Sequence, residues 1–250
     1  MKYAALSHKG NARKKNEDSY YIPDGKGPDN LAIVADGMGG YHGGEVASAM
    51  SVEVVCNYIA ANKPDAGNSR NRAKVIIDAI KAANSAVYDY AATNEFLYGM
   101  GTTMVLLYVV ENTAMIANIG DSRGYLVRAK KIRQITTDHS LVQELVEQGR
   151  LSAAEARNHP HKNIITRAIG SGDQSRADIY ELTLQPDDVI LLCSDGLNDC
   201  ITDEDILHAV NSNDTINDAA TELVAKALAD GGRDDVTVVI AHAGGREAHR

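Results

Sequence analysis

Acidic residues stand beside a glycine or a turn at the ends of four apolar stretches of this chain. Asp36-Gly37 and Asp195-Gly196 follow two such runs, Gly120-Asp121 follows a third, and residues 232–235 precede a fourth. A carboxylate at a strand end, freed by a glycine turn, is held rigidly while its oxygens clear the sheet, so it can bind a hard cation. One Asp-Gly pair would indicate only a turn. Four of them favour an acidic pocket for divalent cations.

Helices that could pack against these strands are predicted from apolar residues at helical spacing. Two amphipathic segments, residues 44–61 and 72–92, are separated by a polar loop, which predicts an antiparallel pair lying on a sheet. Ser152 opens a capping-box pattern, and Thr202 has the form of a helix N-cap. The further helices are expected over residues 141–147, after Ser152, after Thr202 and over residues 215–229.

Strands are predicted where short runs rich in β-branched residues alternate with turn residues. Their close spacing favours antiparallel meanders, and the regular alternation of a doubly wound parallel sheet is missing. Strand clusters with paired helices between them therefore predict an α+β fold built as a layered sandwich. Besides the run before Asp36, the strands are expected over residues 102–110, 113–119, 124–128, 132–136, 179–184, 188–193 and 236–242.

Composition narrows the function further. The 250 residues fit one large domain, which we expect over residues 1–242, with a frayed tail over residues 243–250. The net charge of −9 argues against a nucleic-acid or anionic-membrane surface. The three cysteines form no C-x-x-C pair, the N-terminus lacks the apolar core of a signal peptide, and the longest apolar run, residues 104–110, is too short to span a bilayer. These features predict a soluble cytoplasmic protein.

The residues that could do chemistry fall into six segments. In their order and spacing, these segments resemble the type 2C metal-dependent Ser/Thr protein phosphatase family, and most closely its compact bacterial members that consist of the catalytic domain alone. The resemblance covers essentially the whole chain. The segments are Arg13-Lys14-Lys15-Asn16-Glu17-Asp18-Ser19, Asp36-Gly37-Met38-Gly39-Gly40, Gly101-Thr102-Thr103, Gly120-Asp121-Ser122-Arg123, Ser194-Asp195-Gly196-Leu197 and Gly232-Arg233-Asp234-Asp235.

The resemblance implies a central antiparallel β-sandwich flanked by pairs of helices, four layers in the order α-β-β-α. It also implies two divalent ions, Mn²⁺ or Mg²⁺, bridged by a water. Sites made of carboxylates and water suit such hard ions better than Zn²⁺. By position in the family's motifs, Asp36 is the bridging carboxylate, Gly37 offers its carbonyl, Asp195 and Asp234 hold one ion, and Glu17 and Asp18 support the other partly through waters.

Arg13 matches the family's phosphate-binding arginine, whose planar guanidinium can meet two phosphate oxygens at once. Asp121 matches a position that, with Asp195, can hold a third, weaker ion. The alternative for Asp121, a turn carboxylate paired with Arg123, stays open. We predict no chemical role for Thr102 and Thr103, which are expected to be strand residues.

The general acid is left open by two departures from the family's pattern. Met38 stands where animal members carry a histidine, and Tyr41-His42 stands where compact bacterial members have a histidine directly after Gly-Gly. Either His42 or a metal-bound water could protonate the leaving group. In the pair Asp234-Asp235, which departs from the usual Asp-Asn, the ligand role is assigned to Asp234, and Asp235 is expected only to add charge beside the site or to cap a turn.

The remaining histidines are not expected to bind metal. His139, His159 and His161 lie in or near residues 138–170, which the resemblance identifies as a variable flap beside the active site. The pair His159 and His161 has the spacing of zinc ligands, but no cysteine or third ligand accompanies it. A flap or loop role is therefore the prediction.

The function implied is hydrolysis of phosphoserine and phosphothreonine by direct attack of the metal-bridging water, with Arg13, Asp36 and Asp195 as the catalytic residues. Phosphorylated proteins would be the substrates, a bacterial Ser/Thr kinase the opposing enzyme in signalling, and the phosphatase a monomer. The motifs of cysteine, aspartyl-phosphate and other dinuclear phosphatases are absent from the sequence. Two alternatives remain: a pseudophosphatase that only binds, and a hydrolase of small phosphate esters.

Overall fold

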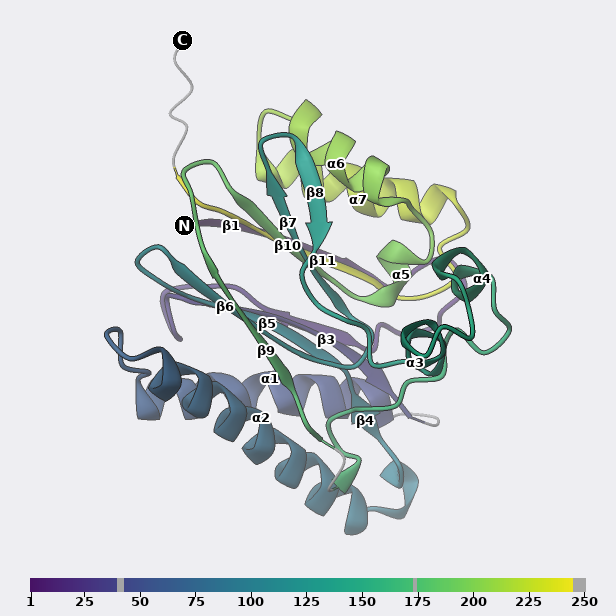
Figure 1. The fold of residues 1–250 in the computed structure, drawn as a ribbon. Coiled ribbons are helices and arrows are strands. Elements are labelled where there is room, and N and C mark those ends of the chain that lie inside the picture. Colours follow the sequence, from purple (N-terminus) through teal and green to yellow (C-terminus); the bar gives the residue numbers. More distant parts are fainter. Residues whose placement is uncertain (40–42, 173–174, 245–250) are drawn as a thin grey trace.

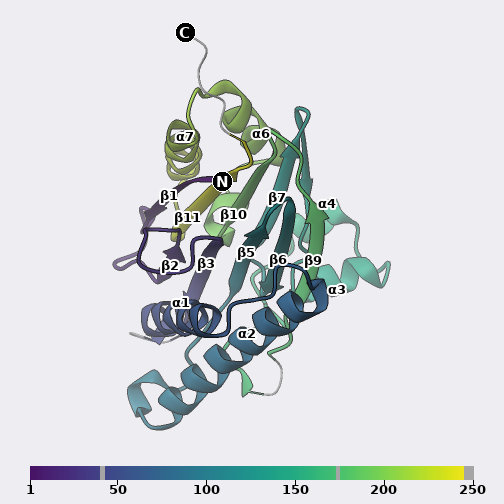
Figure 2. The same ribbon diagram turned by 90° about the vertical axis from the view of Figure 1, so that its left-hand side faces the viewer.

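Two antiparallel sheets lie face to face in the middle of the molecule, and helices cover both outer faces (Figure 1, Figure 2). The computed structural model describes residues 1–39, 43–172 and 175–244. The layers follow the order α-β-β-α, which confirms the predicted α+β sandwich. All strand pairs run antiparallel, as the short connections between the predicted strands required.

The first sheet combines the two ends of the chain with its middle. β1 pairs with β11 over its whole length, with Lys2 opposite His242 and His8 opposite Val236. The N-terminal segment is therefore tied to the last strand. The strand order is β1 (Lys2–His8), β11 (Val236–His242), β10 (Val189–Cys193), β7 (Arg123–Arg128) and β8 (Lys131–Gln134).

The second sheet holds the strand that carries Asp36. The order is β2 (Asp18–Tyr21), β3 (Leu31–Met38), β5 (Met104–Val110), β6 (Thr113–Ile119) and β9 (Asp178–Thr183), and the short β4 (Gly101–Thr102) pairs with the end of β3. β3 and β5 are buried on both faces, which explains why they are apolar without alternation.

Each sheet is covered by one helix pair. α1 (Gly43–Asn62) and α2 (Ser69–Ala92) cover the second sheet, and α6 (Asp203–Ser212) and α7 (Ile216–Ala229) cover the first. A third apolar layer, with Ile116 and Leu192 among its members, fills the space between the sheets. The short helices η1 (Glu95–Leu97), α3 (Leu141–Glu147), α4 (Ala153–Arg157) and α5 (Asp195–Asn198) lie outside these pairs.

The predicted flap lies beside one end of the sandwich and carries α3 and α4 (Figure 1). Backbone hydrogen bonds tie its two ends together, from Leu141 to Ile164 and from Thr166 to His139. The capping box predicted from Ser152 is present at the start of α4, and the predicted N-cap Thr202 forms a second capping box at the start of α6. No helix in the described part of the chain is long and apolar enough to cross a membrane.

Several elements differ from their prediction. β1 and β2 were not predicted, because their residues mix polar and apolar types and most of their side chains are only half-buried. The strand expected over residues 102–110 is divided into β4 and β5 at Thr103. The four-residue helix α5 was also missed. The expected tail lies outside the described residues from residue 245 onward.

Candidate metal centre

Strand pairing brings the first acidic residues together. Asp18, the first residue of β2, is directly opposite Asp36 near the end of β3. The Gly37 amide donates to the Glu17 carbonyl over 3.2 Å, so Glu17 is held against the same strand end. Three residues with predicted ligand roles, 17, 18 and 36, therefore share one edge of the second sheet.

Two threonines fix the backbone of Asp36. The Thr102 hydroxyl donates to the Asp36 carbonyl over 2.7 Å, and the Thr103 amide donates to the same oxygen over 2.9 Å. The Asp36 amide in turn donates to the Thr103 hydroxyl over 3.2 Å. No role was predicted for these threonines. The structure shows that they position the residue expected to bridge the ions.

Glycines allow the backbone segments of the site to approach closely. A side chain at Gly37 would collide with the Gly44 carbonyl at the start of α1, and one at Gly196 would collide with the Asp235 carbonyl. Gly120 has a φ of +107°, which side-chain-bearing residues rarely adopt. The glycines beside the acidic residues thus serve packing as well as turning.

The second group of acidic residues comes from the first sheet. Asp195 opens α5 directly after β10, and residues 234 and 235 lie just before β11. Ser194 links the two groups, because its hydroxyl donates to Asp18 Oδ2 over 2.8 Å. The strand-end positions predicted for Asp36, Asp121 and Asp195 are confirmed.

Asp235, which had been expected only to add charge or to cap a turn, is 3% exposed. Its Oδ2 accepts the Glu17 amide over 2.8 Å. It therefore joins the loop before β11 to the loop before β2. Sequence reasoning missed this role because the two segments lie more than 200 residues apart in the chain.

The acidic side chains raise one another's pKa. Burial raises the pKa of Asp18 to about 7 and that of Asp195 to about 6, and neighbouring carboxylates add to both shifts. Burial also raises the pKa of Asp121, and the charge of Asp195 contributes. For Asp36, burial raises the pKa well above the usual range, with further contributions from the charges of Asp18, Asp195, Asp121 and Asp234. Such mutual repulsion is what a cation would relieve.

Several oxygens of this cluster have no hydrogen-bond partner among the described residues. They are buried Oδ1 atoms of Asp18, Asp195 and Asp235. Buried carboxylate oxygens without donors are costly unless they bind a cation, and an all-oxygen donor set suits Mn²⁺ or Mg²⁺. The residues therefore fit these ions in their chemistry. Within residues 1–39, 43–172 and 175–244, no three histidine, cysteine or acidic side chains are already arranged as a metal-binding group.

Arg13 lies beside this cluster and contacts two of its acidic side chains. Its Nη2 is 2.6 Å from Asp234 Oδ1 and 2.7 Å from Asp234 Oδ2, and its Nη1 is 3.7 Å from Glu17 Oε2. The Arg13 side chain is 43% exposed. The structure therefore places the predicted phosphate-binding group at the acidic cluster, where it holds a predicted metal ligand.

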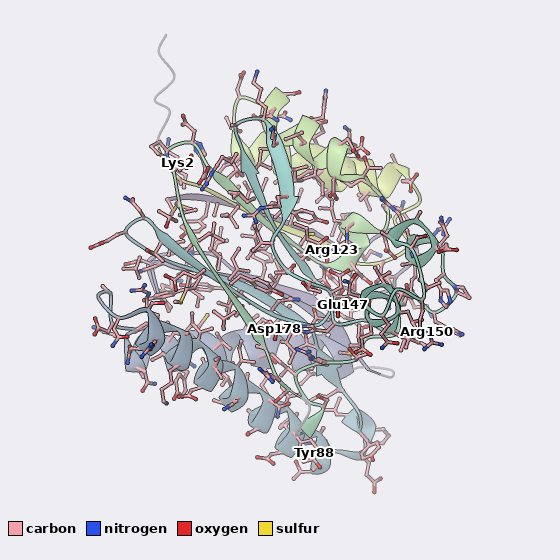
Figure 3. The ribbon with its side chains drawn as sticks, in the orientation of Figure 1. Lys2, Tyr88, Arg123, Glu147, Arg150 and Asp178 are labelled. Atoms are coloured by element: carbon pink, nitrogen blue, oxygen red, sulfur yellow. The ribbon has the colours of Figure 1, made fainter. Side chains whose placement is uncertain are left out.

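The Arg123 side chain forms its ion pair with Asp138 rather than with Asp121, and both the ligand role and the turn role of Asp121 stay predictions. The Arg123 guanidinium donates to both carboxylate oxygens of Asp138, over 2.6 to 3.0 Å. Figure 3 shows Arg123 close to the flap that carries Glu147 and Arg150. No role was predicted for Asp138. Its ion pair with Arg123 joins the start of the flap to β7.

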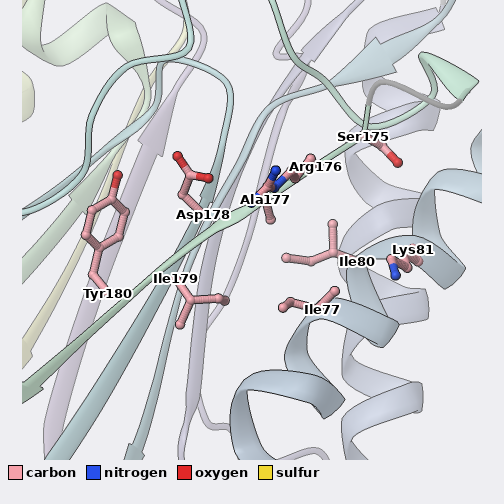
Figure 4. Close-up of a pocket in the computed structure, with 9 residues that line it drawn as sticks. All are labelled: Ile77, Ile80, Lys81, Ser175, Arg176, Ala177, Asp178, Ile179 and Tyr180. Carbon is pink, nitrogen blue, oxygen red and sulfur yellow. The ribbon is translucent and has the colours of Figure 1, made fainter. Parts of the chain in front are cut away.

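A cavity of about 410 Å³ opens between the acidic cluster and the flap. Asp121 and Asp195 lie on its inner side, α3 and α4 contribute Val142 and Ala156, and α6 contributes Glu204. A ligand in this cavity would therefore contact both the flap and the acidic cluster, and an anionic phosphate would need cationic groups there to offset the charge of the carboxylates. A second cavity, of about 740 Å³, lies away from this cluster, between α2 and β9 (Figure 4).

The candidates for the general acid are only partly placed. Met38 ends β3, whereas Tyr41 and His42 lie outside the described residues. The ring centroids of His159 and His161 lie 5.6 Å apart with their planes tilted by 55°, and neither residue belongs to a metal-ligand group in the described part of the chain. A flap position for this histidine pair agrees with the prediction.

Comparison with known proteins agrees with this site. The sequence model of the family described as protein phosphatase 2C matches residues 4–236. The serine/threonine phosphatase stp of Listeria innocua is 36% identical over 233 residues, which cover 93% of this chain and 92% of the relative.

Solved structures resemble the chain over its whole length. The serine/threonine phosphatase Stp1 from Staphylococcus aureus has a TM-score of 0.89 at 34% identity, covering 98% of this chain and 96% of its own. The catalytic domain of the phosphatase PstP, in complex with two manganese ions, has a TM-score of 0.85 at 36% identity and covers 98% of both chains. The resemblance found in the sequence motifs is confirmed, and the chain belongs to the protein phosphatase 2C family.

Proposed function

We propose that this protein is a metal-dependent phosphatase that removes phosphate from phosphoserine and phosphothreonine in proteins. The observation that carries the proposal is the cluster of buried, mutually repelling carboxylates beside the partly exposed guanidinium of Arg13. Family membership and relatives named as serine/threonine phosphatases support it. Residues 1–242 would act as one catalytic domain.

The carboxylates would hold two Mn²⁺ or Mg²⁺ ions, as the PstP catalytic domain holds two manganese ions. Bound there, such ions would lower the pKa of a coordinated water and neutralise charge on the phosphoryl oxygens. A third, weaker ion would use Asp121 together with Asp195. The remaining ligands would be Glu17, Asp18, Asp36, the Gly37 carbonyl and Asp234.

The protein's own groups bind and orient the substrate. Arg13 supplies two or more N–H donors to the phosphate, and the hydrogen bonds from Thr102 and Thr103 keep Asp36 at a fixed position. Burial raises the pKa of Cys56 and of Cys193 to about 12 and also raises the pKa of Cys200, which disfavours a thiolate nucleophile. We propose that water is the attacking group and that the phosphate is transferred in a single displacement.

Phosphoproteins made by a Ser/Thr kinase are the proposed substrates, and the cavity under the flap is wide enough for a peptide segment. A pseudophosphatase would have lost metal ligands, whereas Asp36, Asp195 and Asp234 are all present. Mn²⁺-dependent release of phosphate from a phosphothreonine peptide, compared with a phosphotyrosine peptide and a small phosphate ester, tests the proposal. No release from the phosphothreonine peptide at saturating Mn²⁺ would refute it.

The metal-free protein should lose stability as the pH rises from about 4 to about 7. An unfolded aspartate has a pKa of about 3.9, whereas in the native state the pKa of Asp18 is about 7 and that of Asp195 about 6. The native state thus binds more protons in this window, so its free energy of unfolding falls as these protons leave.

Melting curves in a chelator at about pH 5 and about pH 8 measure this effect, and the higher melting temperature is expected at the lower pH. Saturating Mn²⁺ at the higher pH should raise the melting temperature, because the ions bind the native carboxylates and relieve their repulsion. A melting temperature that does not respond to Mn²⁺ would speak against the metal centre.

Asp36→Asn, Asp195→Asn and Asp234→Asn should each abolish turnover while the protein stays folded. Each substitution removes a ligand charge, so the loss should exceed the roughly 10–100-fold cost typical of residues that only support a ligand. Asp89→Asn, at an exposed position of α2, is the matched control and should keep full activity. Near-native activity of any one of the three variants at saturating Mn²⁺ would remove that residue from the site.

Arg13→Ala should lower kcat/KM. The corresponding loss of transition-state stabilisation should be about 1.5–3 kcal/mol, the range for a hydrogen bond to a charged group. Arg13→Lys should recover only part of the loss, because an ammonium cannot make the two-pronged contact. The neighbouring exposed Lys14, changed to Ala, serves as the control. Steady-state kinetics on a phosphopeptide decide the matter, and full activity of Arg13→Ala would show that Arg13 does not bind the phosphate.

Hydrolysis of a chiral thiophosphate ester should invert the configuration at phosphorus. A single displacement by water inverts it, whereas a phosphoenzyme requires two displacements and returns the original configuration. The stereochemistry of the product, read by phosphorus NMR in isotopically labelled water, measures the outcome. Net retention, or label trapped on the protein after a rapid acid quench, would establish a covalent intermediate.

A further inference from the structure

His139 connects the flap to the turn that carries Asp121. The imidazole is almost completely buried, with 5% of the residue exposed. Its Nδ1 accepts the Gly120 amide over 3.1 Å, and the His139 amide donates to the Gly120 carbonyl over 2.9 Å. One histidine thus satisfies both backbone groups of the glycine that directly precedes Asp121.

These contacts determine the tautomer of the ring. A peptide N–H can only donate, so Nδ1 must be the unprotonated nitrogen and Nε2 carries the proton. Asp178 Oδ2 lies 3.1 Å from Nε2 and accepts that proton in a hydrogen bond. Arg167 Nη1 lies 3.2 Å from Nε2 but cannot donate to a protonated nitrogen, and it pairs with Asp178 Oδ1 instead. Burial lowers the pKa of His139, in agreement with a neutral ring.

The Gly120 turn has a backbone conformation that glycine adopts easily but that costs it conformational freedom, so its hydrogen bonds determine how well the turn is held. Gly120 has a φ of +107°, and Thr103 packs where its side chain would be. Asn118 Nδ2 donates to the Gly120 carbonyl over 3.1 Å, so the Gly120 carbonyl has two donors, this side chain and the His139 amide. The Gly120 amide, in contrast, is held by the His139 ring. Loss of that acceptor would leave a buried N–H unpaired and release the turn.

The ring is itself held by β9. Its carboxylate partner, Asp178, begins β9, where Asp178 and Tyr180 project from one face while Ile179 lies on the other face beside Ile77 and Ile80 (Figure 4). The Tyr180 hydroxyl accepts the Thr137 amide over 3.0 Å, which ties β9 to the residues just before His139. The position of His139 therefore depends on β9 and on the flap.

We propose that His139 is a positioning residue for the metal centre. Its neutral ring, held as the Nε2–H tautomer by Asp178, fixes the Gly120-Asp121 turn and so the direction in which the Asp121 carboxylate faces the cluster. The role of Asp121 as a metal ligand rests on the proposed function. The tautomer and the support of the turn do not.

Two substitutions separate the two hydrogen bonds of the ring. His139→Asn keeps an oxygen acceptor close to the place of Nδ1, whereas His139→Gln reaches toward Asp178 and leaves the Gly120 amide without an acceptor. Calorimetric titration of metal-free protein with Mn²⁺ measures the consequence, and Asp121→Asn identifies the binding step that depends on Asp121. In that step, His139→Gln should lose about 10–100-fold in affinity, and His139→Asn should lose clearly less.

Asn84→Ala is the matched control. Asn84 is also buried and also accepts a glycine amide, that of Gly170 over 2.8 Å, but it lies on the buried face of α2 and makes no hydrogen bond to the Gly120 turn. This variant should lower the melting temperature without changing Mn²⁺ affinity. A purely structural role of His139 would produce the same result for His139→Gln.

Two further readouts do not depend on hydrolysis. The nitrogen chemical shifts of His139 in metal-free protein should show the proton on Nε2, and amide hydrogen exchange at Gly120 should become faster in His139→Gln than in His139→Asn. A proton on Nδ1, unchanged Mn²⁺ affinity in His139→Gln, or no Mn²⁺ step that depends on Asp121 would overturn the proposal. Absence of phosphatase activity with these results intact would overturn only the proposed function.

Discussion

Repulsion between buried carboxylates is unfavourable, and the rest of the molecule must offset its free-energy cost for the chain to stay folded. Asp18 faces Asp36 across two paired strands, and the charges of Asp195, Asp121 and Asp234 add to the field at Asp36. Taking such groups out of water is unfavourable, and gathering them increases the cost. A single marginal core could not hold this arrangement. Here three apolar layers, one between the sheets and one under each helix pair, supply the compensating burial.

The scaffold holds two of the acidic positions through the backbone. Thr102 and Thr103 bind the main chain of Asp36, and His139 binds the main chain of Gly120, directly before Asp121. Asp36 and Asp121 are thus positioned without using their carboxylate oxygens, whereas the carboxylates of Asp18, Asp234 and Asp235 accept hydrogen bonds from Ser194, Arg13 and the Glu17 amide. Preorganised sites generally depend on such supporting contacts behind the residues that meet the ligand.

The sequence predicted those parts of the site that are local in the chain. Asp36 and Asp195 could be found because an apolar run followed by Asp-Gly is read within a few residues. The structural contacts of Asp235, Thr102 and His139 were not predicted, because their partners are far away in sequence or belong to another strand. β2 was missed for a related reason, since this four-residue edge strand has only half-buried and exposed side chains and shows no apolar pattern.

In the proposed function, Arg13 connects the charge balance of the cluster to substrate binding. Its guanidinium neutralises Asp234 in this structure, yet the same donors are those that a phosphate would require. One planar group cannot serve both anions fully, so phosphate and Asp234 compete for it. Another cation that neutralises Asp234 therefore makes the Arg13 guanidinium available to phosphate. Conversely, phosphate bound to Arg13 makes the Asp234 carboxylate available to that cation. Linkage makes the two effects equal in size, which means that the affinity for phosphate and the availability of Asp234 as a ligand must rise together.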